Sequence, residues 1–140
     1  MGFKYAEDGP LADLTIESWG ETLDEAFANA ALAMFNAITP LEAVEAKVSR
    51  AFEVEGDDMG SLLFNFLDEL LYINDVEFLV FSEIQLTVDA EAFKLGAVCR
   101  GEPFDLARHV QGIAVKAVTF HDMRMESQDG KWTVRVVLDT

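Results

Sequence analysis

The chain has 140 residues, of which 51% are hydrophobic and 11 are phenylalanine, so it is long and apolar enough to bury a core of its own. This composition excludes a mainly disordered protein, because the apolar surface is large enough to offset the entropy lost on ordering. The formal net charge of −16 argues against nucleic acid as a direct partner, because phosphate binding needs a stripe of lysine and arginine.

The compartment is predicted from three local features. Cys99 is the only cysteine, so no disulfide can form within the chain. The first residues, MGFKYAED, have neither the basic nor the apolar part of a secretory signal. The longest apolar run, at about residues 73–82, is interrupted by Asn74, Asp75 and Glu77 and is too short for a bilayer. We therefore expect a cytosolic, cytoplasmic protein with no membrane partner.

A hairpin or bent strand is predicted at the start of the chain. Residues 3–7 and 14–18 have the composition of short strands. Gly9 and Pro10 lie between them and favour a turn.

Two amphipathic helices are predicted next. The first begins at a capping box in residues 22–25 and ends before Pro40. After a strand at about residues 46–54, Asp57 or Asp58 caps the second helix. Their apolar residues recur at spacings of three and four, which is the pattern of a helix with one buried face: Leu23, Ala26, Phe27, Ala30, Ala31, Met34, Phe35 and Ile38 in the first, Leu62, Leu63, Phe66, Leu67, Leu70 and Leu71 in the second.

The second half of the chain is rich in predicted strands. Apolar residues alternate at residues 78–88 and again at 93–99, as in half-buried antiparallel strands. Cys99 belongs to this alternation and is interpreted as a small core residue. Residues 102–111 form a polar loop with no clear periodicity.

A long strand is predicted from Ile113 to Met125, followed by a hairpin at Asp129-Gly130 and a last strand at residues 131–139. In the last strand Trp132, Val134, Val136 and Leu138 face the core, and Thr133, Arg135, Val137 and Asp139 face the other side. The predicted fold is one α+β domain spanning residues 1–140, with two helices covering a mainly antiparallel or mixed sheet.

Motifs for nucleotide binding and for catalysis are absent from the sequence. There is no P-loop, no GxGxxG after a strand and no cysteine pair with zinc spacing. A catalytic pair of Cys99 and His121 is disfavoured, because a reactive thiolate needs a polar, accessible setting. Asp68 and Glu69 point about 100° apart around a helix, which favours a solvated helix face over an acid–base site.

Two aspartates near opposite ends of the chain form a candidate metal site. Asp13 precedes an apolar strand and Asp139 is the penultimate residue. Because the termini of a small domain tend to lie close together, we expect Asp13, Asp139 and the terminal carboxylate of Thr140 to converge. These anionic groups repel each other, and a hard divalent cation relieves that repulsion. Two surface aspartates that bind nothing are the commoner case, and the spacing alone leaves both interpretations open.

The chain resembles the archease family over nearly its whole length. The stretches that carry the resemblance, in chain order, are PLADL, GETLDEAFANAALAMF, SLLFNFLDELL, Gly101-Glu102, VKAVTFH and VVLDT. The lysine-containing strand and the Asp-x terminus are the most specific of them.

The resemblance implies a non-enzymatic activator of the RtcB-type, GTP-dependent RNA ligase of tRNA splicing and RNA repair. It implies that the protein promotes guanylylation of the ligase and allows it many turnovers. It also implies a divalent metal, Ca²⁺ before Mg²⁺ or Mn²⁺, bound by Asp13, Asp139 and Thr140. The His and Thr that usually precede the first aspartate are Pro10 and Leu11 here, so we expect weaker metal binding.

Three further residues belong to the family pattern. Lys116, His121 and Glu102 are predicted as contacts to the ligase or as support for the metal region. A solvent-facing lysine and a hydrogen-bonded sheet histidine are equally simple interpretations of the first two. Two other functions stay open: a small metal-dependent hydrolase or nucleotidyl enzyme would turn over substrate alone, and a general chaperone would need a large exposed apolar patch.

Overall fold

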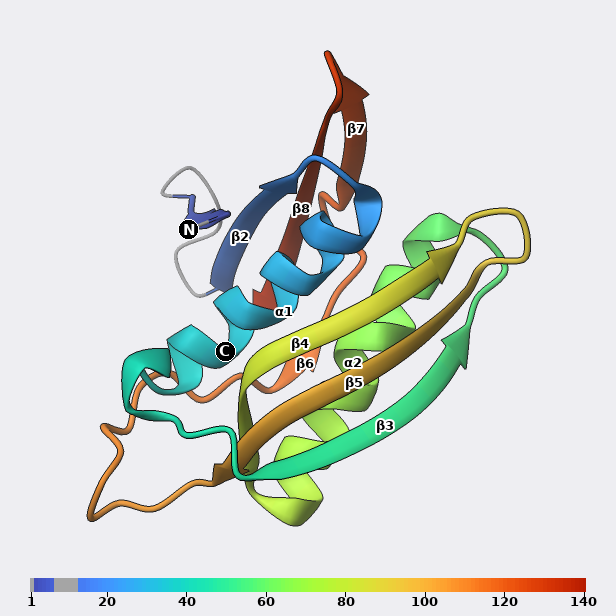
Figure 1. Cartoon of the computed structure of the whole chain (residues 1–140). Helices are drawn as coiled ribbons and strands as arrows, with labels where there is room; N and C mark the ends of the chain where they lie inside the picture. Colours follow the sequence, from blue (N-terminus) through green and yellow to red (C-terminus); the bar gives the residue numbers. More distant parts are fainter. Residues whose placement is uncertain (1, 7–12) are drawn as a thin grey trace.

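The protein has the α+β architecture that the sequence predicts (Figure 1). The computed structural model describes residues 2–6 and 13–140. In chain order, the elements in these residues are β1 (Phe3–Tyr5), β2 (Asp13–Gly20), α1 (Leu23–Ile38), the 3₁₀ helix η1 (Leu41–Ala43), β3 (Val48–Glu55), α2 (Met59–Glu77), β4 (Leu79–Asp89), β5 (Lys94–Pro103), β6 (Ala117–Val118), β7 (Arg124–Gln128) and β8 (Lys131–Asp139).

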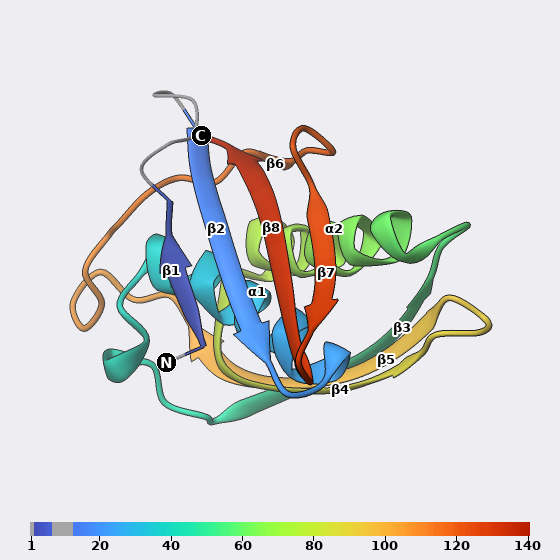
Figure 2. The ribbon, with the colours of Figure 1, turned by 90° about the horizontal axis from the view of Figure 1, so that it is seen from above.

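The strands form two antiparallel sheets. In the first, the order is β1-β2-β8-β6, with β7 also paired to β8; in the second it is β3-β5-β4. Figure 2 looks onto the first sheet, with both helices behind it. Helix α1 contacts β2 and β8 of the first sheet and β4 of the second, so it lies between the two sheets. Helix α2 packs beside it against β3, β4, β5 and β6.

Helix α1 begins where the sequence predicts, because its first turn is capped. Thr22 Oγ1 accepts the N–H of Glu25 at 3.1 Å, and the Glu25 carboxylate accepts the N–H of Glu21 at 2.9 Å. Glu25 therefore reaches one residue further back than in an ordinary capping box. The first bond satisfies an N–H group that the helix itself leaves free, and the second fixes the residue before the cap.

Helix α2 is capped by Asp58, the second of the two predicted candidates. The Asp58 carboxylate accepts the N–H of Ser61 at 2.7 Å, and Ser61 Oγ accepts the N–H of Asp58 at 3.1 Å. The helix stops at Phe78, whose backbone is left-handed with φ 59°. No helix in the described part of the chain has the length and apolar character needed to cross a bilayer.

The core lies where the two helices meet the inner faces of the sheets. Its largest fully buried side chains include Phe27, Phe35, Phe66 and Phe81. Cys99 is also fully buried, and burial raises the pKa of its thiol to about 12. The prediction that Cys99 is a small core residue is therefore confirmed, since a protonated, enclosed thiol is a poor nucleophile.

The prediction of one long strand at residues 113–125 is wrong. Within this stretch only the short strand β6 and the first residues of β7 are extended in a sheet. Before β6, the N–H groups of Gly112 and Ile113 donate to the last carbonyl groups of α1 instead of to a strand. Between β6 and β7, Asp122 has φ 53° and turns the chain. These interruptions depend on tertiary contacts and on one backbone angle, which apolar alternation does not report.

The last hairpin follows the prediction. Asp129 and Gly130 have positive φ angles of 54° and 75°, as a type I′ turn requires. Along β8 the predicted core-facing valines and Leu138 are fully buried. The opposite side is less open than its polarity indicates, because Arg135 is 7% and Val137 only 1% exposed. Thr133 is half-buried, and Asp139 at the end of the strand is exposed.

Candidate metal centre

Strands β2 and β8 bring the start of β2 next to the end of the chain. Their antiparallel register pairs Asp13, the first residue of β2, with Asp139, the last residue of β8 (Figure 2). Residues directly opposite each other in a sheet have their side chains on the same face, so both carboxylates leave the sheet on one side. The expectation that these two aspartates converge is therefore confirmed.

The Asp13–Asp139 pair is of the closely spaced kind. A strand residue directs its N–H and C=O to the same neighbouring strand, and the Asp139 carbonyl oxygen accepts the N–H of Lys116 at 2.8 Å, on the β6 side. The pair is consequently not joined by ladder hydrogen bonds. In such pairs the Cα atoms are about 4.5 Å apart, closer than in hydrogen-bonded pairs.

Oxygen atoms are the chemical groups that this end of the sheet offers. The terminal carboxylate belongs to Thr140, the residue after Asp139, and adds a third anion. Thr15 lies on the same face, two residues further along β2, opposite Val137. Its side chain is buried, and in the described part of the chain Thr15 Oγ1 has no hydrogen-bond partner. Two facing carboxylates, a terminal carboxylate and an unpaired buried hydroxyl fit an oxygen-binding cation or its bound water.

The two aspartates alone would not complete the ligand shell of a cation. Among residues 2–6 and 13–140, no three His, Cys, Asp or Glu side chains converge closely enough to hold a metal. Asp13 and Asp139 therefore depend on a non-side-chain group, the terminal carboxylate, and on carbonyl or water oxygens. Ca²⁺ tolerates such an irregular shell, whereas Mg²⁺ demands near-ideal octahedral geometry.

The lysine-containing segment lies beside the same end of β8. Besides the Lys116 bond to Asp139, Thr119 donates to the Val137 carbonyl oxygen through its N–H at 3.2 Å and through Oγ1 at 2.8 Å. The N–H of His121 then donates to Thr119 Oγ1 at 3.3 Å. Lys116 and His121 are both exposed. They flank the candidate centre, and their contact with a ligase stays a prediction.

Glu102 lies in a different environment. Its buried carboxylate accepts hydrogen bonds from the Arg108 guanidinium, from the N–H of Glu45 at 2.6 Å and from His109 Nε2 at 3.2 Å. These donors, Arg108 first, hold the pKa of Glu102 down to about 2. None of its described contacts reaches Asp13 or Asp139, so the structure does not bring Glu102 into the candidate centre.

His109 completes this buried cluster, and the sequence does not single it out. Its Nδ1 accepts the N–H of Asp105 at 2.9 Å, so the neutral ring carries its proton on Nε2 and donates it to Glu102. The side chain is fully buried. The only signal in the sequence is a histidine in a polar loop a few residues after Glu102, and that spacing does not separate a buried histidine from a solvated one.

Residues 3–140 match the model of the Archease protein family. This chain belongs to the archease family. A Protein archease from Pyrococcus abyssi is 43% identical over 131 residues, which cover 91% of this chain and 92% of that protein. A Protein archease-like from Drosophila melanogaster is 40% identical over 145 residues, which cover 99% of this chain and 90% of that protein.

Solved archease structures share the fold. The solution structure of Methanobacterium thermoautotrophicum protein 1598 matches with a TM-score of 0.85 and 39% identity, over 99% of both chains. A crystal structure from Thermotoga maritima, described as an archease and possible chaperone, matches with a TM-score of 0.62 over 98% of this chain and 100% of that one. At 15% identity the second likeness concerns the fold alone. Pro10 and Leu11, where this archease departs from the usual motif, lie outside the described residues.

Proposed function

We propose that this archease is a non-enzymatic activator of an RtcB-type, GTP-dependent RNA ligase. In this proposal it promotes guanylylation of the ligase and allows it many turnovers in tRNA splicing and RNA repair, in the cytoplasm. A divalent cation, Ca²⁺ rather than Mg²⁺ or Mn²⁺, would be held by Asp13, Asp139 and Thr140 at the surface that meets the ligase.

The β2–β8 register is the observation that carries the proposal. It places Asp13 opposite Asp139 on an open sheet end, where nothing in the described residues neutralises the two carboxylates. Like charges directly opposite each other destabilise a sheet. Family membership adds the second support, since the motifs PLADL and VVLDT that contain these aspartates are the ones that resemble archeases.

Each residue of the centre has a separate task in the proposed mechanism. Asp13 and Asp139 fix two oxygen ligands at the spacing set by β2 and β8, and Thr140 supplies the third anion. A bound hard cation would supply positive charge that neutralises these anions and orders the chain end. Lys116, held by its backbone next to Asp139, adds an exposed basic side chain at the rim of the same surface.

Electrostatic attraction brings the two proteins together in this proposal. The chain carries a net charge of −16, and a ligase that handles RNA is expected to be basic around its active site. Salt screens such attraction, because the Debye length falls from about 10 Å at 0.1 M to about 3 Å at 1 M. The association rate should therefore fall steeply with ionic strength, and a rate independent of salt would contradict the electrostatic part of the proposal.

The test is ligation of a 2′,3′-cyclic-phosphate RNA by limiting ligase. Wild-type protein should raise the number of turnovers per ligase, and Asp139→Ala should remove most of this effect. Asp57→Ala is the matched control, because Asp57 is an exposed aspartate just before the N-terminus of α2 and does not belong to the candidate centre. Full activation by Asp139→Ala would contradict the role of the centre, and no activation by wild-type protein would contradict the function itself.

The two alternative functions predict other outcomes. A hydrolase or nucleotidyl enzyme would turn over substrate without the ligase, and Asp139→Ala would abolish that turnover. A general chaperone would suppress aggregation of unrelated unfolded proteins, with no need for Asp139. One observation favours the chaperone function: Leu106 and Val110, on one loop, are 72% and 67% exposed and could contact apolar segments of unfolded proteins.

A further inference from the structure

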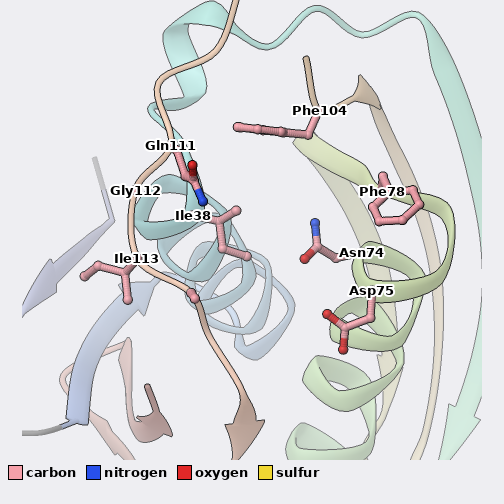
Figure 3. A pocket seen from close by; sticks show the side chains of 9 residues that line it. Ile38, Asn74, Asp75, Phe78, Phe104, Gln111, Gly112 and Ile113 are labelled. Carbon is pink, nitrogen blue, oxygen red and sulfur yellow. The ribbon is translucent and has the colours of Figure 1, made fainter. Parts of the chain in front are cut away.

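A pocket of about 240 Å³ lies between the C-terminal ends of the two helices (Figure 3). Ile38 from the end of α1, Phe78 after the end of α2, and Phe104 and Ile113 from the loop before β6 give it apolar walls. The pocket contains no residue of the candidate metal centre, and it adjoins the buried cluster around Glu102, because the Phe104 ring lies 5.6 Å from the His109 ring.

The wall formed by residues 111–114 is fixed to α1. The N–H of Gly112 donates to the carbonyl oxygen of Ile38 at 2.8 Å, and the N–H of Ile113 donates to that of Ala37 at 2.7 Å. A Cβ atom on Gly112 would lie 2.3 Å from the Ala37 oxygen, so only glycine allows this approach. The pocket is thus formed before any ligand arrives, which lowers the entropy cost of binding.

Phe78 is a rigid aromatic residue held at the pocket edge. Its N–H donates to the Asn74 carbonyl oxygen at 3.0 Å, and its own carbonyl oxygen accepts the N–H of Phe104 at 2.7 Å. Its backbone is left-handed, a conformation that favours glycine or asparagine, and its ring is 66% exposed. Phe78 is not among the residues of the hydrophobic core, so core packing does not account for this conformation at the edge of a pocket.

The polar groups that line the pocket are acidic or neutral. Asp75 projects its carboxylate into the open space, and the part of the chain that the structure describes offers it no ion-pair partner (Figure 3). Asn74 uses its amide nitrogen to bond the Leu79 carbonyl oxygen, so its amide oxygen remains available. Among the described lining residues none is basic.

We infer that this pocket binds an arginine side chain from a basic, partly apolar segment of the ligase. A guanidinium group stacks on an aromatic ring and pairs with a carboxylate through two parallel hydrogen bonds, which matches Phe78 and Asp75. Apolar residues next to the arginine would cover Leu106 and Val110, which lie between the two lining residues Phe104 and Gln111.

The ligase is the occupant because the pocket is continuous with the proposed activating surface. The segment that forms its wall ends at Ala114, and Lys116, two residues later, bonds Asp139. A partner that covers the metal centre is therefore within reach of this wall. The inference rests on the proposed function: the pocket supplies affinity for the same ligase that the metal centre activates.

The test measures ligase affinity and activation separately. Phe78→Asn and Asp75→Lys should each weaken binding by about tenfold or more, as for anchor residues at an interface. Activation at saturating protein should stay at the wild-type level, because neither residue belongs to the metal centre. Phe78→Asn should fold at least as stably as wild type, since asparagine accepts the left-handed backbone more readily.

Matched controls lie at the remote β4–β5 turn (Figure 1). Phe93 also has a left-handed backbone, with φ 52°, and Glu91 is an exposed acidic residue of the same turn. Phe93→Asn and Glu91→Lys should leave the affinity unchanged.

Four results would overturn the inference. In two of them, Phe78→Asn and Asp75→Lys bind the ligase with wild-type affinity, or the controls lose as much. In the third, the free protein is a dimer that Phe78→Asn dissociates, which would make a second copy the occupant. In the fourth, wild-type protein does not bind the ligase at all. If wild type activates the ligase and the variants bind normally, only the pocket inference fails; if wild type does not activate it, the proposed function fails as well.

Discussion

Two groups of carboxylates in this molecule have opposite surroundings. At the end of the first sheet, Asp13 faces Asp139 at the spacing of a close strand pair, with the chain terminus next to them. Near the end of β5, Glu102 is buried and receives donors from Arg108, His109 and the Glu45 backbone.

The difference separates a structural carboxylate from a candidate ligand. Arg108 and His109 tie the loop after β5 to Glu102, the Glu45 N–H ties the segment before β3 to it, and its charge is neutralised inside the fold. Asp13 and Asp139 do not join parts of the fold in this way, since their proximity costs free energy unless a positive charge is present. A carboxylate pair that the fold leaves uncompensated is therefore the better indicator of a bound cation.

The largest expected effect is stabilisation by calcium. Binding to the folded state alone raises the free energy of unfolding by about 2.7 kcal/mol at a ligand concentration 100 times the Kd. Wild-type protein should show this increase in urea unfolding with Ca²⁺ against EDTA. Asp139→Asn should lose it and Glu102→Gln should keep it; an equal calcium effect in all three proteins would indicate nonspecific binding to an acidic surface.

Glu102→Gln should lower the free energy of unfolding at pH 7 by about 2 kcal/mol, the range for a hydrogen bond to a charged group. The pKa of Glu102 is lowered from 4.5 to about 2, so its contribution is complete above pH 4.5 and is lost as the pH falls towards 2. The difference between variant and wild type should shrink between pH 7 and pH 3, measured by urea unfolding. A difference that stays constant over this range would contradict the assignment.

Thr15→Val should stabilise the protein in EDTA by about 1 kcal/mol, because it removes a buried hydroxyl that has no partner among the described residues. Ser18→Ala is the control in the same strand, since Ser18 Oγ donates to the Ala26 carbonyl oxygen at 2.8 Å and its loss should destabilise. Thermal unfolding of both variants measures the contrast. Destabilisation by Thr15→Val would show that the hydroxyl has a partner after all.

The smallest expected effect concerns the repulsion itself. Asp13→Asn should raise the free energy of unfolding in EDTA by about 0.5 kcal/mol, because like charges directly opposite in a sheet are unfavourable. The gain should decrease as salt is added. Urea unfolding at low and high ionic strength measures it, and a loss of stability at low salt would mean that the two carboxylates do not repel each other.

Local signals in the sequence predict the helices well. The capping residues Thr22 and Asp58 lie beside long apolar stripes, and both helices begin next to them. The Asp129-Gly130 turn needs positive φ angles, which its residues accept. These features are determined within a few residues of chain, so the α+β fold and its last hairpin follow from them.

Features set by distant contacts are not predictable in this way. The segment at residues 113–125 alternates like a strand, but α1 captures the amides of Gly112 and Ile113 and the chain turns at Asp122. The tendency of termini to meet predicts the convergence of Asp13 with Asp139, but the fold produces it through the β2–β8 register, since Gly2 lies beside Trp19 at the other end of β2. No comparable rule leads from Glu102 to His109. The pocket beside Phe78 joins three segments and has no counterpart in a local pattern.

The central claim is that Asp13, Asp139 and Thr140 share one bound cation. A crystal structure of the protein with Mn²⁺, which scatters anomalously and binds oxygen ligands as Ca²⁺ does, tests it most directly. The account predicts one strong anomalous peak between the Asp13 and Asp139 carboxylates and in contact with the terminal carboxylate. Saturable Mn²⁺ binding in solution, with the peak elsewhere or with these carboxylates turned apart, would contradict it.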